Sequence, residues 1–240
     1  MNLDYLRNTQ TTMNEQFERL VPLYGEANLN TLKHATVAVI GLGGVGAYAA
    51  EALARIGVGR LIILDKDIIV KSNINRLITA THDTIGRKKT TVSKERILRI
   101  NPDCDVIEYD TVFDENMVAP LFAHKMDFIF DAIDSVKNKA LLIQNALHHD
   151  IPIIASVGQG NRKFSNMITI TDLFETAYDP LARKLRIALR KNGIHHNVPV
   201  VFSKEQPFKD NTLSFVASNP FGPATAGLLA AEYICHKLME

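Results

Sequence analysis

A glycine-rich turn is the part of this sequence that most directly predicts chemistry. Its glycines Gly41, Gly43, Gly44 and Gly46 follow the apolar run 37–40 and come directly before an alanine-rich segment with a helical pattern. Such a turn lets the backbone approach a phosphate group, and the helix N-terminus after it offers unpaired N–H groups and a positive dipole. The turn therefore predicts a ligand that carries phosphate, although glycine-rich turns also occur without one.

Asp65 ends the next predicted strand and stands 19 residues after Gly46. A carboxylate at this point can accept hydrogen bonds from the hydroxyls of a ribose. NAD and ATP both carry such a ribose, so Asp65 does not distinguish them, and it could equally be an ordinary strand-end carboxylate. Asp67 offers a second carboxylate close by. The choice between the two nucleotides therefore depends on residues further along the chain.

Cations and carboxylates downstream favour a triphosphate. Asn73 and Arg76 follow the second predicted strand, and the guanidinium of Arg76 can bind phosphate oxygens through two N–H groups. Lys89 lies at the start of a predicted helix, from which its ammonium can reach the same edge of the sheet. Asp131 and Asp134 follow a later strand, where one of them could hold a Mg²⁺ ion between phosphates. Each residue alone could be a surface charge or a helix cap, but together they favour ATP with Mg²⁺ over NAD.

Alternating strands and helices must position these residues. We expect strands at 36–40, 60–64, 105–109, 127–130 and 153–156, and helices at 45–56, 88–100, 115–122 and 136–149. This alternation predicts an α/β protein with a Rossmann-like, doubly wound, mostly parallel sheet. Ligands of such sheets bind at the carboxyl ends of the strands, which is where the glycine turn and the charged residues fall.

The two ends of the chain depart from this alternation. An N-terminal helical segment is expected at 12–35, with Pro22 and Gly25 as breakers. After residue 158 the pattern predicts antiparallel C-terminal additions on the substrate side, namely a strand at 167–171, a helix at 179–191, a strand at 199–202 and a last helix at 225–238. We expect one adenylation domain over 1–240, made of the helical segment 12–35, a nucleotide-binding core 36–157 and a substrate-side extension 158–240.

Composition excludes several classes of protein. The formal net charge is +1, so the overall charge gives no argument for nucleic-acid binding. There is no run of 18 apolar residues, and the first ten residues carry Asp4, Arg7 and several polar groups in place of the apolar stretch of a signal peptide, so we expect a cytoplasmic protein with no membrane partner. The two cysteines, Cys104 and Cys235, form no CxxC motif, which excludes a disulfide framework and a four-cysteine zinc site and suggests two small apolar side chains.

Five motifs together resemble the ubiquitin-activating-enzyme superfamily of ATP-dependent adenylating enzymes. They are GLGGVG at 41–46, LDKD at 64–67, SNINR at 72–76, GRKK at 86–89 and DAIDS at 131–135. Their order and spacing are those of the superfamily, and the resemblance runs from residue 16 to residue 160. It implies a Rossmann-like fold that binds ATP and activates a carboxylate as an acyl-adenylate.

The resemblance also implies a role for each matching residue. The four glycines would line the phosphates, Asp65 would hold the ribose, and Asn73, Arg76 and Lys89 would contact the phosphate chain. Asp134 would hold magnesium, while Asp131 is the weaker candidate.

Arg19 has an implied role that would need a second subunit. The segment 16–19 resembles the part of the superfamily in which an arginine completes the site of the neighbouring subunit. This makes Arg19 a catalytic candidate and implies a homodimer. Its alternative is an ordinary cation on the surface of a helix.

The C-terminal half resembles one branch, the tRNA threonylcarbamoyladenosine dehydratases, through the segments 172–173, 179–186 and 199–205. The branch implies adenylation of the threonylcarbamoyl carboxylate on a tRNA adenosine, followed by cyclisation with release of pyrophosphate and AMP. An alternative is adenylation of the C-terminal glycine of a ubiquitin-like sulfur carrier protein, and a second alternative is an NAD-binding module. A monovalent cation and a sulfur-transfer partner are left open by the resemblance.

A run of cations agrees with a tRNA substrate. No acid occurs between residues 183 and 191, and the helix there carries Arg183, Lys184, Arg186, Arg190 and Lys191 on one broad face. Such a stripe can neutralise phosphates in a sequence-tolerant way, although a solvated helix face is an equal alternative. Arg162 and Lys163 could extend the stripe.

Overall fold

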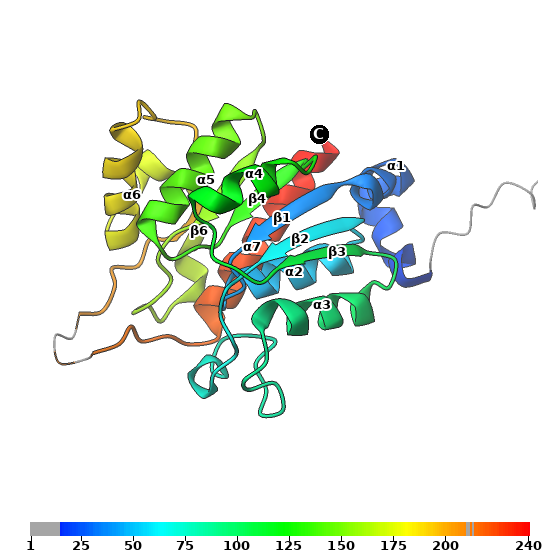
Figure 1. Cartoon of the computed structure of the whole chain (residues 1–240), viewed down its shortest axis with the longest axis horizontal. Helices are drawn as coiled ribbons and strands as arrows, with labels where there is room; N and C mark the ends of the chain where they lie inside the picture. The colour runs from blue at the N-terminus through cyan, green and yellow to red at the C-terminus, as the bar shows by residue number, and fades with distance from the viewer. Residues whose placement is uncertain (1–14, 210–211, 213) are drawn as a thin grey trace, which may run out of the picture.

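The computed structural model describes residues 15–209, 212 and 214–240, and these build one seven-stranded sheet (Figure 1). Its strands are β1 (Thr36–Ile40), β2 (Arg60–Leu64), β3 (Asp105–Tyr109), β4 (Phe128–Asp131), β5 (Ile153–Ser156), β6 (Ile168–Asp172) and β7 (Pro199–Ser203). They lie in the order β3-β2-β1-β4-β5-β7-β6, and each neighbouring pair is parallel except β6 with β7. The predicted doubly wound, mostly parallel sheet with an antiparallel C-terminal addition is therefore confirmed.

Helices cover both faces of the sheet. They are α1 (Val21–His34), α2 (Gly46–Arg55), α3 (Lys89–Ile100), α4 (Glu115–Phe122), α5 (Val136–His148), α6 (Pro180–Arg190) and α7 (Phe221–Met239). Short 3-10 helices occur at η2 (Glu15–Leu20), η3 (Lys71–Asn73), η4 (Ser165–Met167) and η5 (Leu173–Glu175). One core joins the sheet to α1, α2, α3 and α7, and the other joins it to α4, α5 and α6.

The central strand β1 shows why the strands consist of unbroken apolar runs. Val37 and Val39 contribute to the core beneath α2 and α7, whereas Ala38 and Ile40 contribute to the core beneath α5. Successive side chains of a strand point to opposite faces, and both faces are covered by helices here. Every residue of β1 is therefore buried.

The ends of the helices differ from the sequence-based expectation in a few places. Pro22 was expected to break the N-terminal segment, but it lies in the first turn of α1, where its missing N–H is harmless. Gly25 interrupts α1 with a φ of 76°, as a breaker should. Residues 12–14 of the predicted segment lie outside the described residues. Helix α7 begins at Phe221, four residues before the predicted start, because Pro223 fits the first turn.

No helix within the described parts of the chain has the length and apolar character that crossing a membrane requires. The sheet continues from β5 through β7 to β6, so the substrate-side extension adds strands to the nucleotide-binding core. The division into three parts of one adenylation domain stays a prediction.

Candidate active site

A cavity of about 420 Å³ opens at the carboxyl ends of the central strands. Eight of the ten predicted site residues line it: Gly41, Gly43, Gly44, Asp65, Asn73, Arg76, Lys89 and Asp134. They come from five separate stretches of the chain, which the parallel sheet brings to one edge. Gly46 and Arg19 are the two that do not line it.

The glycine turn joins β1 to α2 and leaves room on its cavity side. Gly41 has a φ of 97°, and a Cβ there would stand 2.7 Å from the carbonyl oxygen of Ala132. A Cβ on Gly43 would meet nothing within 4 Å, so the backbone there is open to an approaching group. Gly46 is required for packing, because a Cβ would overlap the carbonyl oxygen of Gly41. The turn therefore has the shape that phosphate binding needs.

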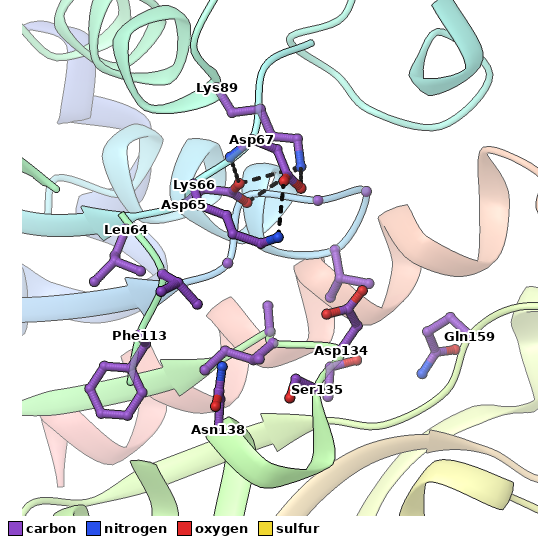
Figure 2. Close-up of a pocket in the computed structure, with 18 of the residues that line it drawn as sticks. Leu64, Asp65, Lys66, Asp67, Lys89, Phe113, Asp134, Ser135, Asn138 and Gln159 are labelled. Carbon is purple, nitrogen blue, oxygen red and sulfur yellow. Dashed lines mark hydrogen bonds and ion pairs between the residues drawn. The ribbon is translucent and has the colours of Figure 1, made fainter. Parts of the chain in front are cut away.

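The buried residues Asp65 and Lys89 form a charged group with the exposed Asp67 (Figure 2). The carboxylate of Asp65 accepts hydrogen bonds from the backbone N–H of Leu42 at 2.7 Å and of Asp67 at 2.8 Å. Lys89 Nζ lies 2.9 Å from Asp67 Oδ2 and 3.4 Å from Asp65 Oδ1. Burial raises the pKa of Asp67, but the hydrogen bond and charge of Lys89 outweigh it and lower the pKa. Lys89 is thus held at the cavity wall by two carboxylates.

Arg76 lies against the glycine turn, because a Cβ on Gly44 would stand 3.2 Å from Arg76 Cγ. Its Nη1 donates to the carbonyl oxygen of Ser72 and to Asn75 Oδ1, both at 2.9 Å. Within the described residues no carboxylate forms an ion pair with it, so its charge is available to an anion. Asn73 Oδ1 accepts from the N–H of Val70 at 3.2 Å, which holds the η3 turn together.

Asp131 and Asp134 have different environments despite being three residues apart. Asp131 ends β4, is fully buried and lies 2.9 Å from Lys139 Nζ. Burial raises the pKa of Asp131, against the opposing charge of Lys139. Asp131 therefore faces the core and cannot hold a metal ion in the cavity. Asp134 lines the cavity and is exposed.

Sequence reasoning missed Lys139, which is 0% exposed. Its signal was present, because Leu142, Ile143 and Ala146 stand three, four and seven residues later and form the buried face of α5. A lysine on that face must find a carboxylate inside the protein. Lys139 also donates to the carbonyl oxygen of Asp131 at 3.2 Å, which anchors the turn that presents Asp134.

Two amide side chains of the cavity wall were also missed, Asn138 and Gln159 (Figure 2). Gln159 follows β5 and its Nε2 donates to the carbonyl oxygens of Val157 and Val201, both at 3.4 Å. Both residues follow strands that end at this edge of the sheet, which is the signal that could have found them.

Arg19 lies far from the cavity of its own chain. It is exposed on η2, where Phe17 packs against Gly57, just after the C-terminal end of α2. The glycine turn stands at the other end of α2, which is about 15 Å long at 1.5 Å per residue. A role for Arg19 at a cavity would therefore need a neighbouring subunit, and this role stays a prediction beside the alternative of an ordinary surface cation.

Four of the five cations predicted to form an exposed stripe at 183–191 are exposed in the structure. Arg183, Lys184, Arg190 and Lys191 are exposed. Arg186 is half-buried and donates to the carbonyl oxygens of Leu173 at 3.2 Å and Thr176 at 2.9 Å. It therefore ties α6 to η5.

The extension of the stripe through Arg162 was wrong. Arg162 is buried, and its Nη2 lies 3.2 Å from Asp179 Oδ2. It also donates to the carbonyl oxygens of Gly158 and Glu205. Its guanidinium therefore holds together the loops around the cavity and is not available to a polyanion.

Both cysteines are buried and behave as apolar residues. Burial raises the pKa of Cys104 to about 11 and of Cys235 to about 12. Thiols with such pKa values are protonated at neutral pH and are poor nucleophiles.

The chain is similar to known proteins over nearly its whole length. It is 37% identical to the tRNA threonylcarbamoyladenosine dehydratase of Bacillus subtilis, over 95% of this chain and 96% of that one. The crystal structure of Escherichia coli tRNA N6-threonylcarbamoyladenosine dehydratase in complex with ATP matches with a TM-score of 0.89 at 36% identity, covering 93% of both chains. The molybdopterin-synthase adenylyltransferase of Escherichia coli is 31% identical over 52% of this chain and 49% of that one.

The family model matches a longer stretch than the five motifs. The model of the ThiF family covers residues 16–230, from the η2 turn to the middle of α7. It includes every residue that lines the cavity. The resemblance drawn from the motifs is thereby confirmed, and this chain belongs to the ThiF family.

Proposed function

We propose that this protein uses ATP to adenylate the threonylcarbamoyl carboxylate of a modified tRNA adenosine and then closes that side chain into a ring. The observation that carries the proposal is the cavity at the strand ends. It combines an open glycine turn with Asp65, Arg76, Lys89 and Asp134, which suit the parts of ATP. The names of the similar dehydratases, and the ATP in one of their crystal structures, support this choice of reaction and nucleotide.

Two displacements make up the proposed reaction. A carboxylate oxygen of the substrate attacks the α-phosphorus of ATP, and pyrophosphate leaves. A nitrogen of the same side chain then attacks the activated carbonyl carbon, so a five-membered ring closes and AMP leaves. Alignment of these groups and neutralisation of the phosphate charges by Arg76 and Lys89 are the contributions expected of the protein. The protonated thiols argue against a covalent enzyme intermediate.

Asp134 is the residue suited to Mg²⁺. Among the described residues no cluster of three metal-binding side chains occurs, and Asp134 is the exposed carboxylate of the DAIDS turn. Mg²⁺ commonly takes one or two carboxylates and completes its shell with water and substrate phosphates, so a single carboxylate fits. The ion would supply charge neutralisation at the phosphates of ATP.

The four exposed cations of α6 are the expected contact for tRNA phosphates. Leu181, in the first turn of α6, lines the cavity, so this helix extends away from the reaction site. A tRNA bound along α6 could therefore present its modified adenosine to the cavity. A tRNA-modifying role also agrees with the expected location in the cytoplasm.

A homodimer would explain Arg19. The exposed side of α1, α2 and α7 carries Leu23 and Leu228 and a cavity of about 310 Å³. Helix α7 starts beside the glycine turn, since a Cβ on Gly44 would lie 3.1 Å from Pro223, and it ends near α1. Antiparallel pairing of two copies along α7 would bring the η2 turn of one copy to the cavity of the other.

The decisive experiment measures AMP release from ATP by the purified protein. Threonylcarbamoylated tRNA, unmodified tRNA and a ubiquitin-like carrier protein are compared as acceptors, and NAD binding is measured in parallel. We expect stimulation by the threonylcarbamoylated tRNA alone. Stimulation by the carrier protein alone, or binding of NAD without ATP, would replace this proposal with one of its two alternatives.

A further inference from the structure

Three loops at the rim of the cavity meet at Asn161 and Arg162. Asn161 has a φ of 58°, its N–H donates to the carbonyl oxygen of Ala217, and its Oδ1 accepts from the N–H of Ala217, both at 2.7 Å. Its carbonyl oxygen accepts from the N–H of Phe208 at 2.7 Å. Asn219 Nδ2 donates to the carbonyl oxygen of Arg162 at 2.9 Å. The loops 158–164, 204–208 and 215–219 are therefore joined into one structure.

This structure borders the cavity on two sides. Gly158 and Gln159 line the cavity and belong to the first of the three loops. On the other side, the carbonyl oxygen of Ser218 accepts from Asn75 Nδ2 at 3.0 Å, next to Arg76. A substrate that occupies the cavity therefore lies next to this structure.

Exposed phenylalanines are concentrated at this rim. Phe164, Phe208 and Phe215 are 58%, 54% and 67% exposed. A fourth, Phe221, is 64% exposed and begins α7 directly after these loops, where its N–H donates to Asn219 Oδ1, and the other seven phenylalanines of the chain are buried or half-buried. We call Phe164, Phe208 and Phe215 the aromatic rim. Exposed apolar groups gathered at one place mark a binding surface.

The charges around the aromatic rim favour a polyanion. Lys163, Lys204 and Lys209 are exposed, and none of them has a carboxylate partner within the described residues. Glu205 is the acid of the described rim loops, and its carboxylate accepts hydrogen bonds from the N–H groups of Lys163 and Phe164. The carboxylate of Glu205 is therefore bound by backbone N–H groups. The exposed charges of the described rim loops are those of the lysines, so they are positive.

We infer that the aromatic rim binds the unpaired nucleotides that flank the modified adenosine, by stacking their bases on the phenylalanine rings. The inference rests on the proposed function, because it is the adenosine side chain that must reach the cavity. A reactive side chain on a nucleobase can enter only if that base leaves its stack, and its neighbours then lose a stacking partner. Phenylalanine rings replace that partner, while the three lysines contact the phosphates.

The test measures the affinity for a fluorescent RNA stem-loop that carries the threonylcarbamoylated adenosine in its single-stranded loop. Phe164→Ala and Phe208→Ala should each raise the Kd by about tenfold or more, as is usual when a stacking ring is removed. Phe164→Trp should retain the affinity, whereas Phe164→Leu, which keeps an apolar side chain, should lose it. The Kd for ATP without RNA should not change, because neither residue lines the cavity. Leu147→Ala, at the far end of α5, is the surface control.

Salt dependence separates stacking from charge. The phenylalanine variants should leave the slope of log K against log salt unchanged, whereas Lys163→Gln and Lys204→Gln should each reduce it by about 1. Unchanged affinity of Phe164→Ala and Phe208→Ala would overturn the inference, as would full affinity of Phe164→Leu. A change of molecular mass in solution for Phe164→Ala would also overturn it, because the rim would then be a contact between subunits. Failure of the wild-type protein to form AMP with modified tRNA would refute the proposed function instead.

Discussion

Two carboxylates of one short motif show how single residues acquire different chemistry here. Asp131 and Asp134 are three residues apart, yet the first is buried against Lys139 and the second lines the cavity. Asp131 Oδ1 also accepts from the N–H of Ile133 at 3.0 Å, so the buried carboxylate shapes the turn that presents the exposed one. The buried pair is structural and the exposed carboxylate is available to a ligand.

Replacement of Asp134 should affect turnover without affecting the fold. We expect Asp134→Asn to lower the rate of AMP formation by at least about 100-fold, because it removes the carboxylate suited to Mg²⁺ while keeping the size of the side chain. The midpoint of thermal unfolding should stay the same. Asp103→Asn, at an exposed turn, is the matched control. Wild-type turnover in Asp134→Asn would contradict the assignment.

Replacement of Lys139 should affect the fold first. Lys139→Met leaves the carboxylate of Asp131 buried without a compensating charge, which should lower the free energy of unfolding by about 3–5 kcal/mol in urea titrations. The double variant Asp131→Asn with Lys139→Met should recover much of this loss. Equal stability of the single and double variants would contradict this prediction, because the unpaired charge of Asp131 would then not be the cause of the loss.

The same variant has a defined pH dependence. Burial raises the pKa of Asp131, and removing the Lys139 charge that opposes the rise leaves it higher still. A carboxyl group with a folded-state pKa above its unfolded value binds more protons when folded, so its unfavourable effect grows as pH rises through that range. The stability difference between Lys139→Met and wild type should therefore shrink as the pH is lowered. A constant difference between pH 4 and pH 8 would contradict the assignment.

At the level of elements, α6 combines a structural face with a face of exposed cations. Arg186 donates to carbonyl oxygens of Leu173 and Thr176, whereas Arg183 and Lys184 have no ion-pair partner within the described residues. The predicted stripe therefore contains one arginine that holds the helix against η5. Whether a cation of α6 is structural or exposed depends on the neighbouring element that it contacts, and the sequence of the helix does not determine it.

Substitutions along α6 should separate these roles. Arg183→Gln and Lys184→Gln should each reduce the slope of log K against log salt for tRNA binding by about 1, with unchanged stability, because each removes one phosphate contact. Arg186→Gln should instead lower the free energy of unfolding, because buried carbonyl groups lose their donor. Loss of stability in Lys184→Gln, or an unchanged salt slope in all three variants, would contradict the division of α6 into exposed cations that contact phosphates and one structural arginine.

At the level of the whole molecule, the predicted role of Arg19 would require a second copy of the chain. The η2 turn packs near the C-terminal ends of α2 and α7, whereas the cavity lies at their N-terminal ends. An arginine at one end of the fold cannot act at the other end of the same chain. A two-fold dimer removes this difficulty, because antiparallel pairing exchanges the ends.

Mixing two inactive variants tests this arrangement. Arg19→Ala and Asp134→Asn should each be inactive alone, but a mixed dimer holds one cavity with Asp134 from one copy and Arg19 from the other. Random exchange should restore about a quarter of wild-type AMP formation, since half the dimers are mixed and each has one complete site. No recovery after verified subunit exchange would show that Arg19 acts within its own chain or not at all.

The local parts of this protein were predictable from its amino acids. Apolar runs, the glycine turn and helical periodicity are short-range patterns. The predicted bounds of the strands therefore lie within one or two residues of the observed bounds, and the parallel sheet followed from the alternation of strands with helices. The five motifs predicted eight residues that do line one cavity, because parallel strands end at a common edge.

Tertiary structure decided which charges are available. Arg162 and Asp131 were candidates for the surface and the cavity, yet each is buried against an oppositely charged side chain of a following helix or its cap, Asp179 at 17 residues and Lys139 at eight residues along the chain. The aromatic rim likewise arises from three loops that are up to 50 residues apart and meet at Asn161. Such partnerships depend on which segments the folded chain brings together. A short-range pattern can mark a charged residue as buried, as it does for Lys139, but it does not identify the partner, because the free energy of a buried charge is set by the neighbours that the whole fold supplies.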